Sequence, residues 1–314
     1  YIYNAYNVKL NNDSSIDFGD MINLAADYVK ESKYQNKYKY IIIDEIQDIS
    51  NGTYRLIKSL LENNKSCRLF CVGDDWQSIF RFSGSNINLF YNFKNLFGDT
   101  YVSYMTNTYR FDKSLVDISN QFIMLDKSNL DKKVVSYKKH LSVEQCEFTT
   151  NIIKTLDEIG KKENYRRVSV YILGRYGDDR DKLKNEKNIY LSVYPNDNIV
   201  YKKNRNLEIK FLTVHKAKGM EADYVIILNC EDSNKNNKMK GFPTNIQDDP
   251  ILDIILPKSN KNEAYANQNS EERRLFYVAM TRAKKQVFLY IPKEIKNRSI
   301  YVKEIKSIKN KLEN

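Results

Sequence analysis

Cysteine and histidine are scarce in this chain of 314 residues, and their scarcity argues against some kinds of site. The four cysteines form no CxxC pair, and the two histidines lie far from them in the sequence, so a zinc site is not expected. This use of cysteine suits a reducing compartment, and we expect a cytoplasmic protein. No run of about 20 apolar residues predicts a membrane-spanning helix, and the first residues lack a signal-peptide pattern.

Positive charge is what the chain has in excess. It holds 51 Lys and Arg against 40 Asp and Glu, a net charge of +11 at pH 7. Such an excess favours a polyanionic partner such as nucleic acid, although an ordinary basic protein is the alternative. Hydrophobic residues make up 41% of the chain, enough for a packed core, and the length suits about two domains.

Short apolar runs alternate with helical patterns, which indicates parallel sheets covered on both faces by helices. Ser270 is the expected N-cap of the last helix, with Glu271 and Glu272 in its first turn. Residues 231–269, rich in Asn, Lys, Asp and Pro, are predicted to form a long, partly mobile loop. The expected strands are 40–43, 68–72, 168–173, 208–213, 224–229 and 286–291. The expected helices are 22–31, 54–62, 113–124, 144–159 and 271–281.

Two acids follow the most apolar strand, in the run KYKYIIIDEIQDIS at 37–50. Ligands bind at the carboxyl ends of strands in open α/β sheets, so Asp44 and Glu45 stand where chemistry is expected. The aspartate is suited to hold Mg²⁺, and the glutamate to orient and deprotonate a water molecule. Two solvated turn acids are the alternative.

The second strand ends in FCVGDDWQSIFRFSGS at 70–85. Gly73 permits a tight turn, and the neutral amide of Gln77 is suited to contact a terminal phosphate. Phe80 and Phe82 alternate with Arg81, a pattern that indicates a stacking platform for single-stranded bases. A loop whose aromatic side chains return to the core is the alternative.

Three further blocks follow these two: NTYRFDKSLVDISN at 107–120, FLTVHKAKGMEADYVIIL at 211–228 and EERRLFYVAMTRAKKQVFL at 271–289. The five blocks resemble, in order, motifs II to VI of the UvrD/Rep-like group of superfamily 1 helicases, and most of all its bacterial helicase IV branch. DFGDMINLA at 17–25 resembles the segment that leads into motif II. The resemblance implies an α/β fold with two RecA-like parallel-sheet domains, the first truncated at its N-terminal side.

The resemblance also implies roles at an ATP site between the two domains. Asp44 would hold Mg²⁺, Glu45 would activate water, and Gln77 would sense the γ-phosphate. Arg110 and Arg282 would reach the γ-phosphate from the second domain, as arginine fingers do. Taken alone, Arg110 could be a surface arginine, and Arg282 could simply favour the negative end of a helix.

Other residues acquire nucleotide or DNA contacts by the same resemblance. Tyr109 would stack on the adenine, Glu221 would contact the ribose, and Gly219 would close the turn of HKAKG beside the nucleotide. His215, with Phe80, Arg81 and Phe82, would contact DNA. A loop histidine and a basic turn are the alternative interpretations of that segment.

One motif of the family is missing. No GxxxxGK[ST] run occurs, and the nearest match, IGKKEN at 159–164, lacks the first glycine and the hydroxyl residue. We therefore expect the C-terminal part of a longer helicase, with residues 1–103 from the first domain and 104–314 forming the second. Arg110 and Thr213 are too close in sequence for the large insertion domain, called 2B, that UvrD and Rep carry.

The expected activity is ATP- and Mg²⁺-dependent movement, 3′ to 5′, on single-stranded DNA or a junction of single- and double-stranded DNA, in repair or another pathway. By itself the chain is expected to turn ATP over poorly. RNA polymerase or repair proteins are further expected partners, and a membrane is not. The alternative is a non-catalytic nucleic-acid or RNA-polymerase binding module derived from a helicase.

Overall fold

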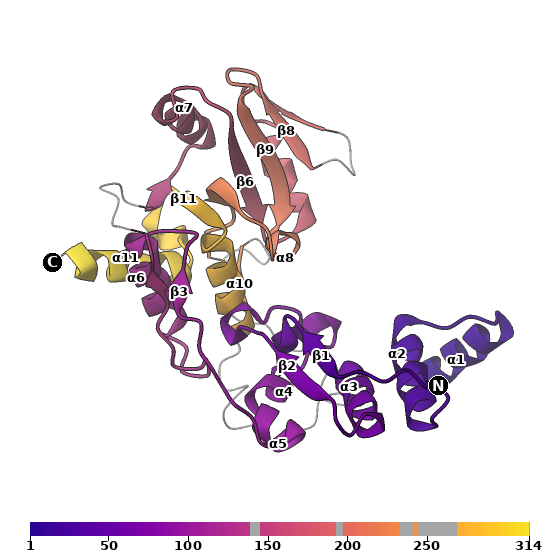
Figure 1. The fold of residues 1–314 in the computed structure, drawn as a ribbon. Helices are drawn as coiled ribbons and strands as arrows, with labels where there is room; N and C mark the ends of the chain where they lie inside the picture. Colours follow the sequence, from indigo (N-terminus) through magenta and orange to yellow (C-terminus); the bar gives the residue numbers. More distant parts are fainter. Residues whose placement is uncertain (139–144, 193–196, 233–240, 244–268, 314) are drawn as a thin grey trace. The chain divides into compact units, whose positions relative to one another are not determined.

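The computed structural model describes residues 1–138, 145–192, 197–232, 241–243 and 269–313 (Figure 1). The chain divides into two compact units, Tyr1–Tyr101 and Val102–Asn314, here called unit 1 and unit 2. Within the described ranges, every helix is too short or too polar to span a bilayer. Unit 1 holds 11 basic and 12 acidic residues, so the other 40 basic and 28 acidic residues belong to unit 2. The positive excess of the chain is therefore confined to unit 2.

Unit 1 is built around two parallel strands in register from Tyr40–Arg68 to Ile43–Cys71. Helix α2 starts at a capping box in which the Asp17 side chain accepts from the Asp20 backbone N–H at 2.7 Å. A small core formed by Ile46, Ile49, Ile57 and Leu89 lies against one face of the strands. The elements are α1 (Ile2–Asn12), α2 (Phe18–Lys30), β1 (Tyr40–Ile43), η1 (Ile46–Asp48), α3 (Asn51–Asn63), β2 (Arg68–Cys71), η2 (Asp75–Gln77), η3 (Arg81–Ser83), α4 (Ile87–Tyr91) and α5 (Phe93–Phe97).

The other face of this small sheet is exposed. Tyr40, Ile42 and Phe70 are 56%, 72% and 59% exposed, while Ile43 and Cys71 turn toward the core. The expectation of parallel sheets covered on both faces is therefore wrong for β1 and β2. The alternation places successive side chains on opposite faces, and only one of those faces has a helical cover in the described part of unit 1.

Unit 2 is built on a seven-stranded sheet of order β5-β11-β10-β6-β9-β8-β7. The five strands from β5 to β9 in that order run parallel, and β8 joins β9 and β7 in antiparallel fashion. A separate parallel pair is formed by β3 (Asn107–Thr108) and β4 (Val135–Ser136). The strands of the seven-stranded sheet are β5 (Cys146–Thr149), β6 (Val168–Gly174), β7 (Ile189–Leu191), β8 (Asn198–Tyr201), β9 (Leu207–Thr213), β10 (Ala222–Ile227) and β11 (Ala283–Tyr290). Its helices include α6 (Lys113–Ile123), α7 (Ile152–Lys162), η4 (Gly177–Leu183), α8 (Val214–Ala217), α10 (Ser270–Met280), η6 (Ile295–Asn297) and α11 (Ile300–Glu313).

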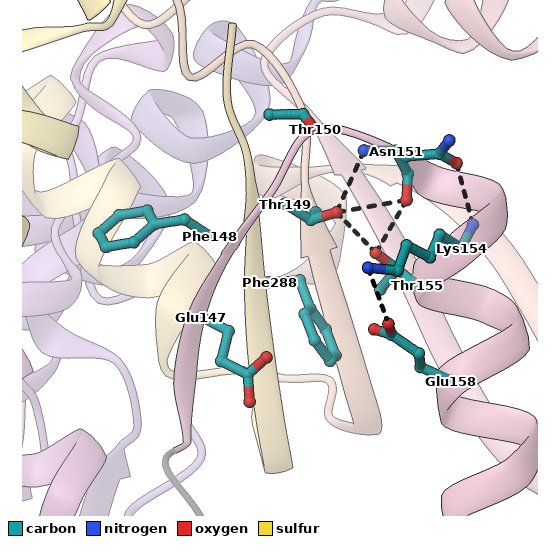
Figure 2. Close-up of a pocket in the computed structure, with 9 residues that line it drawn as sticks. All are labelled: Glu147, Phe148, Thr149, Thr150, Asn151, Lys154, Thr155, Glu158 and Phe288. Atoms are coloured by element: carbon teal, nitrogen blue, oxygen red, sulfur yellow. Dashed lines mark hydrogen bonds and ion pairs between the residues drawn. The ribbon is translucent and has the colours of Figure 1, made fainter. Parts of the chain in front are cut away.

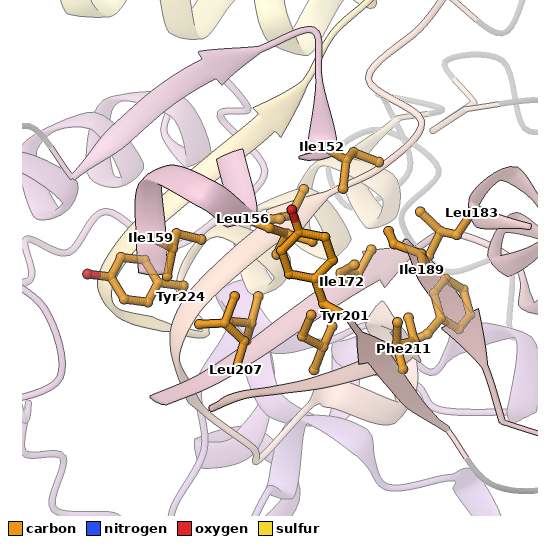
Figure 3. Packing of buried hydrophobic residues seen from close by; sticks show 14 of the residues in the cluster. Ile152, Leu156, Ile159, Ile172, Leu183, Ile189, Tyr201, Leu207, Phe211 and Tyr224 are labelled. Carbon is orange, nitrogen blue, oxygen red and sulfur yellow. The ribbon is translucent and has the colours of Figure 1, made fainter. Parts of the chain in front are cut away.

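Both faces of the unit 2 sheet are covered. On one face, Leu156 and Ile159 of α7 pack with Ile172, Phe211 and other apolar side chains of the central strands (Figure 3). On the other, α10 packs against β10, α6 and α8. The central strands are consequently apolar on both sides, as parallel strands between two helical layers are.

The predicted helix over 144–159 is wrong in its first half. Cys146–Thr149 forms β5, which pairs in parallel with β11, and α7 begins after Asn151, whose side chain accepts from the Lys154 backbone N–H at 2.9 Å. Pairing to a strand that lies far along the sequence overrides the local helical pattern. Helix α10, which the sequence predicts as the last helix, begins at Ser270 with Asn269 as its N-cap, so Ser270 is not the cap. Helix α11 follows it and was not predicted.

The predicted loop over 231–269 lies largely outside the described residues, which here include only 231–232, 241–243 and 269. The segment IGKKEN lies at the end of α7 and in the turn after it. It therefore does not form the loop from a strand to a helix that a phosphate-binding motif requires.

Candidate functional site

The two acids after β1 are held in an uncommon backbone geometry. The Ile46 N–H donates to the Val72 carbonyl at 3.0 Å, and the Val72 N–H to the Ile43 carbonyl at 2.9 Å. In the short segment between Ile43 and Ile46, Glu45 takes a left-handed conformation with φ of 53°. Few non-glycine residues adopt that conformation, and those that do cluster at functional sites. Asp44 and Glu45 are both exposed at this strand end.

A buried amide joins these acids to the loop after β2. The Gln47 side chain is fully buried, donates to the Glu45 carboxylate and accepts from the Asp74 N–H at 2.9 Å. Asp74 in turn accepts from the Gln77 amide at 2.6 Å. The structure thus brings Asp44, Glu45 and Gln77 together through Gln47 and Asp74. Sequence reasoning missed these two linking residues, although both lie within the quoted motifs.

Gly73 lies where this network leaves no room for a side chain. A Cβ atom there would lie 2.6 Å from Gln47 Oε1 and 2.6 Å from Ile46 Cγ2. The glycine therefore allows the loop after β2 to approach the turn after β1. It is a requirement of packing at this position, in addition to the tight turn that the sequence predicts.

The predicted stacking residues of unit 1 differ in exposure. Phe82 is 66% exposed, whereas Phe80 and Arg81 are half-buried. The two phenylalanine rings have centroids 6.1 Å apart and are tilted by 54°. Phe82 is thus presented to solvent beside a second ring, while Trp76 of the same loop is fully buried.

In unit 2, two basic side chains from separate segments contact the same carboxylate. The Arg110 Nε donates to Glu221 Oε2 at 2.9 Å, and the Lys284 Nζ contacts Glu221 Oε1 at 2.6 Å. Lys284 holds the pKa of the Glu221 carboxyl below its usual range, and Arg110 adds to this effect. The same contact raises the pKa of Lys284. Sequence reasoning missed Lys284, whose only signal was its place beside Arg282 in the last block.

Both predicted finger arginines are tied to the end of α10. The Arg110 Nη1 donates to the Thr281 carbonyl at 3.2 Å. Arg282 is nearly fully buried, and its Nε donates to the Val278 carbonyl at 2.9 Å. The carbonyl end of a helix attracts cations, so this geometry includes the dipole contact that the alternative interpretation of Arg282 expects. It also brings Arg282 beside the segment that holds Arg110.

The remaining predicted nucleotide residues lie nearby in sequence. Tyr109 is 64% exposed, and its ring lies 4.9 Å from that of Tyr137, measured between centroids. The contact follows from the parallel pairing of β3 with β4, because Tyr137 comes directly after β4 and Tyr109 directly after β3. Gly219 has φ of +77° in the turn between α8 and Glu221, a conformation that favours glycine.

Glu221 and Lys284 lie at the amino-terminal edge of the seven-stranded sheet, where β10 and β11 begin. His215 lies at the opposite, carboxyl-terminal edge of that sheet, in α8 after the end of β9. Beside it, Arg175 follows β6, because Gly174 of β6 and Thr213 of β9 are register partners. Arg175 makes a bidentate ion pair with Glu272, which is 2% exposed, with its shortest contact at 2.6 Å. Burial raises the pKa of Glu272, and Arg175 opposes that rise. Sequence reasoning missed this pair.

Helix α10 connects the two edges. Glu272 lies near its start, and the Thr281 carbonyl that accepts from Arg110 lies just past its end. Eleven residues of α-helix span about 16 Å. The helix is buried over nearly its whole length, so it joins the segment that carries His215 to the segment that carries Arg110 as one packed element.

The donor atoms fit Mg²⁺ as nucleotide-binding proteins hold it. Among the described residues, no three His, Cys, Asp or Glu side chains cluster as a metal cage. Mg²⁺ commonly takes one or two protein carboxylates and completes its shell with water and substrate phosphates. The exposed Asp44, which has Glu45 beside it, suits that mode.

A hollow of about 270 Å³ between β5 and α7 contains none of the predicted site residues (Figure 2). Its polar side chains satisfy one another: Thr149 and Thr155 are 2.8 Å apart, and Lys154 lies 3.5 Å from Glu158. It therefore adds nothing to the site described above.

The two units define a class of protein with two α/β units. In unit 1 the motif residues follow the carboxyl ends of β1 and β2, and in unit 2 the cluster around Glu221 lies at the amino-terminal ends of β10 and β11. The protein-family model for the UvrD/REP helicase N-terminal domain matches residues 1–98 of the chain. The family model for the UvrD-like helicase C-terminal domain matches residues 193–294. The chain belongs to the UvrD/Rep-like helicase family.

Two helicases with similar sequences agree with this assignment. The chain is 30% identical over 308 residues to DNA helicase IV of Escherichia coli, covering 97% of this chain and 41% of that protein. It is 26% identical over 260 residues to the ATP-dependent DNA helicase Rep of Buchnera aphidicola, covering 78% of this chain and 38% of that protein. A solved structure entitled "The structure of PRRSV helicase" covers 84% of this chain and 37% of its own, with a TM-score of 0.41 and 14% identity.

Proposed function

We propose that the chain carries the ATP-hydrolysing and DNA-contacting parts of a DNA helicase that moves 3′ to 5′ on single-stranded DNA. The observation that supports this most directly is the cluster of Arg110, Glu221 and Lys284 at the end of the helix that leads to Arg282. Family membership and the names of the relatives support the same proposal.

In this proposal the residues after β1 and β2 prepare the water molecule. Asp44 would hold Mg²⁺, which supplies charge neutralisation at the phosphates when it is bound. Glu45 orients the attacking water and accepts its proton, and Gln77 contacts the terminal phosphate. The buried Gln47 holds Glu45 in place, so less reorganisation is needed when the water attacks the terminal phosphate.

Arg110 and Arg282 neutralise charge that develops on the phosphate, with Tyr109 against the adenine and Gly219 and Glu221 beside the nucleotide. Two hydrogen bonds orient the Arg110 guanidinium in advance. Such preorganisation favours a phosphate ligand, because a planar guanidinium loses little freedom on pairing. Phe80, Arg81, Phe82 and His215 contact single-stranded DNA in the same proposal.

We also propose that the chain alone hydrolyses ATP slowly, since its sequence contains no phosphate-binding loop. The test is a titration with MgATP and with single-stranded DNA, followed by a hydrolysis assay with and without that DNA. We expect weak ATP binding that Arg110→Gln weakens further, tight binding of single-stranded DNA, and slow hydrolysis. Rapid hydrolysis stimulated by DNA would contradict the last point. DNA binding without any binding of ATP would favour the non-catalytic module.

A second assay tests the direction of movement in the longest active form of the protein that can be prepared. Duplexes with a 3′ or a 5′ single-stranded tail are offered with ATP, and strand separation is followed by gel electrophoresis. We expect separation of the 3′-tailed duplex only. Equal separation of both substrates would overturn the proposed direction.

A further inference from the structure

Two turns lie side by side at the amino-terminal edge of the unit 2 sheet. Residues 163–167 connect α7 to β6, and residues 202–206 connect β8 to β9. The Asn206 side-chain amide donates to the Tyr165 carbonyl at 2.7 Å, and the Val168 N–H donates to the Asn206 carbonyl at 3.1 Å. These bonds fix the two turns to each other, so their side chains belong to one surface.

Positive charge on this surface is not neutralised by neighbouring acids. Arg166, Lys202 and Arg205 are exposed, and none of them makes an ion pair with any residue that the structure describes. Exposed cations are often no more than solvated charges. Here, however, three of them gather on two turns that hydrogen bonds hold together.

The acids nearest to these turns are already engaged. Asp157 pairs with Lys203 at 3.1 Å, and Glu163 pairs with Lys285 at 2.8 Å. Glu208 pairs with Arg167. These three carboxylates are therefore already paired with other cations. Asp223, at the start of β10, accepts hydrogen bonds from the Ser169 backbone N–H at 2.9 Å and from the Ser169 hydroxyl at 2.8 Å. An anionic ligand is the natural complement of Arg166, Lys202 and Arg205.

Two tyrosines accompany the cations. Tyr165 is 55% exposed, and Tyr190 on the outer strand β7 is 49% exposed. The Lys202 Nζ lies 4.0 Å from the centroid of the Tyr190 ring. Alternation of exposed aromatic and basic side chains is typical of surfaces that bind nucleic-acid strands, where the cations contact phosphates and the rings contact bases or sugars.

This surface lies away from the predicted DNA contact in unit 2. His215 follows the carboxyl end of β9, whereas the turn of residues 202–206 precedes β9, so the two lie at opposite edges of one sheet (Figure 1). A DNA strand at His215 does not by itself account for the cations at the other edge. The confinement of the positive excess to unit 2 agrees with more than one contact there.

We propose that Tyr165, Arg166, Tyr190, Lys202 and Arg205, here called the basic rim, form a second contact for the sugar–phosphate backbone of DNA. The inference rests on the proposed function in so far as the ligand is DNA. It adds a surface that none of the family motifs contains, and it requires no nucleotide.

The test measures binding of the chain to a fluorescent 20-nucleotide thymidine strand and to a fluorescent duplex by anisotropy, over a series of KCl concentrations. The variant Arg166→Gln/Lys202→Gln/Arg205→Gln removes the three cations of the basic rim. Lys303→Gln/Lys306→Gln/Lys311→Gln on α11 removes the same charge from exposed lysines elsewhere in unit 2 and is the matched control. A circular dichroism spectrum verifies that both variants are folded.

We expect the rim variant to bind DNA about tenfold more weakly at low salt. Each lost phosphate contact reduces the salt slope of log K by about 0.7 on single strands and about 0.9 on duplex, so the slope should fall by about 2 to 3. Weaker binding of the duplex alone would assign the basic rim to double-stranded DNA. Weaker binding of the thymidine strand alone would assign it to single-stranded DNA. The α11 control should change binding by less than about twofold.

Two results would overturn the inference. Wild-type affinity of the rim variant would show that these cations are merely solvated, and an equal loss in the α11 control would show an unspecific effect of net charge. The proposed function has a separate test in the same assay, since Phe82→Ala and His215→Ala should weaken binding of single strands. If the wild-type chain binds neither DNA, the proposed function and the inference both fail.

Discussion

Arg110 and Glu221 are 111 residues apart in the chain, and their side chains meet in an ion pair of 2.9 Å. Lys284 contacts the second oxygen of the same carboxylate at 2.6 Å. One acid thus holds two cations, and the group keeps a positive charge that a phosphate would complement. Both ion pairs are partly solvated, so they orient the Arg110 and Lys284 side chains more than they stabilise the fold.

The first prediction concerns the charge state of Glu221. Replacing Lys284 with Met removes the main cause of its lowered pKa, so we expect the Glu221 pKa to rise toward the ordinary value of about 4.3. The measurement is a pH titration of the side-chain carboxyl carbon by NMR. A Glu221 pKa that does not move in Lys284→Met would show that Arg110 alone determines it.

The sign of the accompanying stability effect follows from linkage. A carboxyl whose pKa is lowered by folding stabilises the folded state above its unfolded pKa, and this contribution is lost as pH falls through the folded value. We therefore expect wild type and Glu221→Gln to differ most near neutral pH and to converge in acid. The difference should stay below about 1 kcal/mol because solvent screens the pair.

The second prediction concerns binding of phosphate chains. Glu221→Gln removes the acid that competes for Arg110 and Lys284, so we expect inorganic tripolyphosphate to bind about three- to fivefold more tightly. Such a change corresponds to roughly 1 kcal/mol, a normal value for one exposed charge pair. Calorimetry or NMR measures the affinity. Asp117→Asn, which releases Lys113 on α6, adds the same net charge and should leave binding unchanged.

The third prediction concerns the buried pair of Arg175 and Glu272. Glu272→Gln leaves Arg175 without its counter-charge in a site where Glu272 is 2% exposed, and we expect a loss of about 3–5 kcal/mol in the free energy of unfolding. Urea unfolding followed by far-UV circular dichroism measures it. Asp117→Asn breaks an exposed pair and should change stability by at most about 0.5 kcal/mol.

A double variant separates charge from packing at the same position. Arg175→Met/Glu272→Leu removes both charges, so no unpaired charge remains in the interior. We expect it to recover most of the stability that Glu272→Gln loses. If the double variant is as unstable as the single one, the pair contributes through shape and not through charge.

The fourth prediction concerns Gly73. An added Cβ would lie 2.6 Å from Ile46 Cγ2 and Gln47 Oε1, so Gly73→Ala should destabilise unit 1 by about 1–3 kcal/mol. The chain has one tryptophan, Trp76, which is fully buried in unit 1, so its fluorescence reports unfolding of that unit. The control is Gly52→Ala, where the nearest atom is 3.5 Å away in a helix. The control should be neutral or stabilising by up to about 1 kcal/mol.

Local patterns predicted most of the regular structure. The apolar run at 40–43 is a strand, and the helix expected over 113–124 ends one residue early as α6. Helices α1 and α11 were not predicted. Two other failures came where the decisive partner lies far along the chain. Residues 146–149 have a helical pattern but pair with β11, and the covered face predicted for β1 and β2 has no cover in the described part of unit 1.

In the candidate site, too, the residues of local motifs could be predicted, whereas residues that depend on distant contacts could not. Asp44, Glu45 and Gln77 could be proposed from strand ends and from resemblance, because short motifs keep their chemistry in one stretch of chain. Gln47 escaped notice because its importance lies in a fully buried amide that bonds to the next strand's loop. Lys284 and Arg175 escaped because a basic residue has many surface uses, and only the position of an acid distinguishes them.

By itself, the sequence determined the family, the order of the motifs and the α/β class, since periodicity and motif spacing are local properties. Only the tertiary structure decided which side chains meet: Arg110 with Glu221 and Lys284, Arg175 with Glu272, and the two turns of the basic rim with each other. The physical reason is that contacts across a parallel sheet depend on strand order and register. These are set by the packing of the whole unit and not by any single segment.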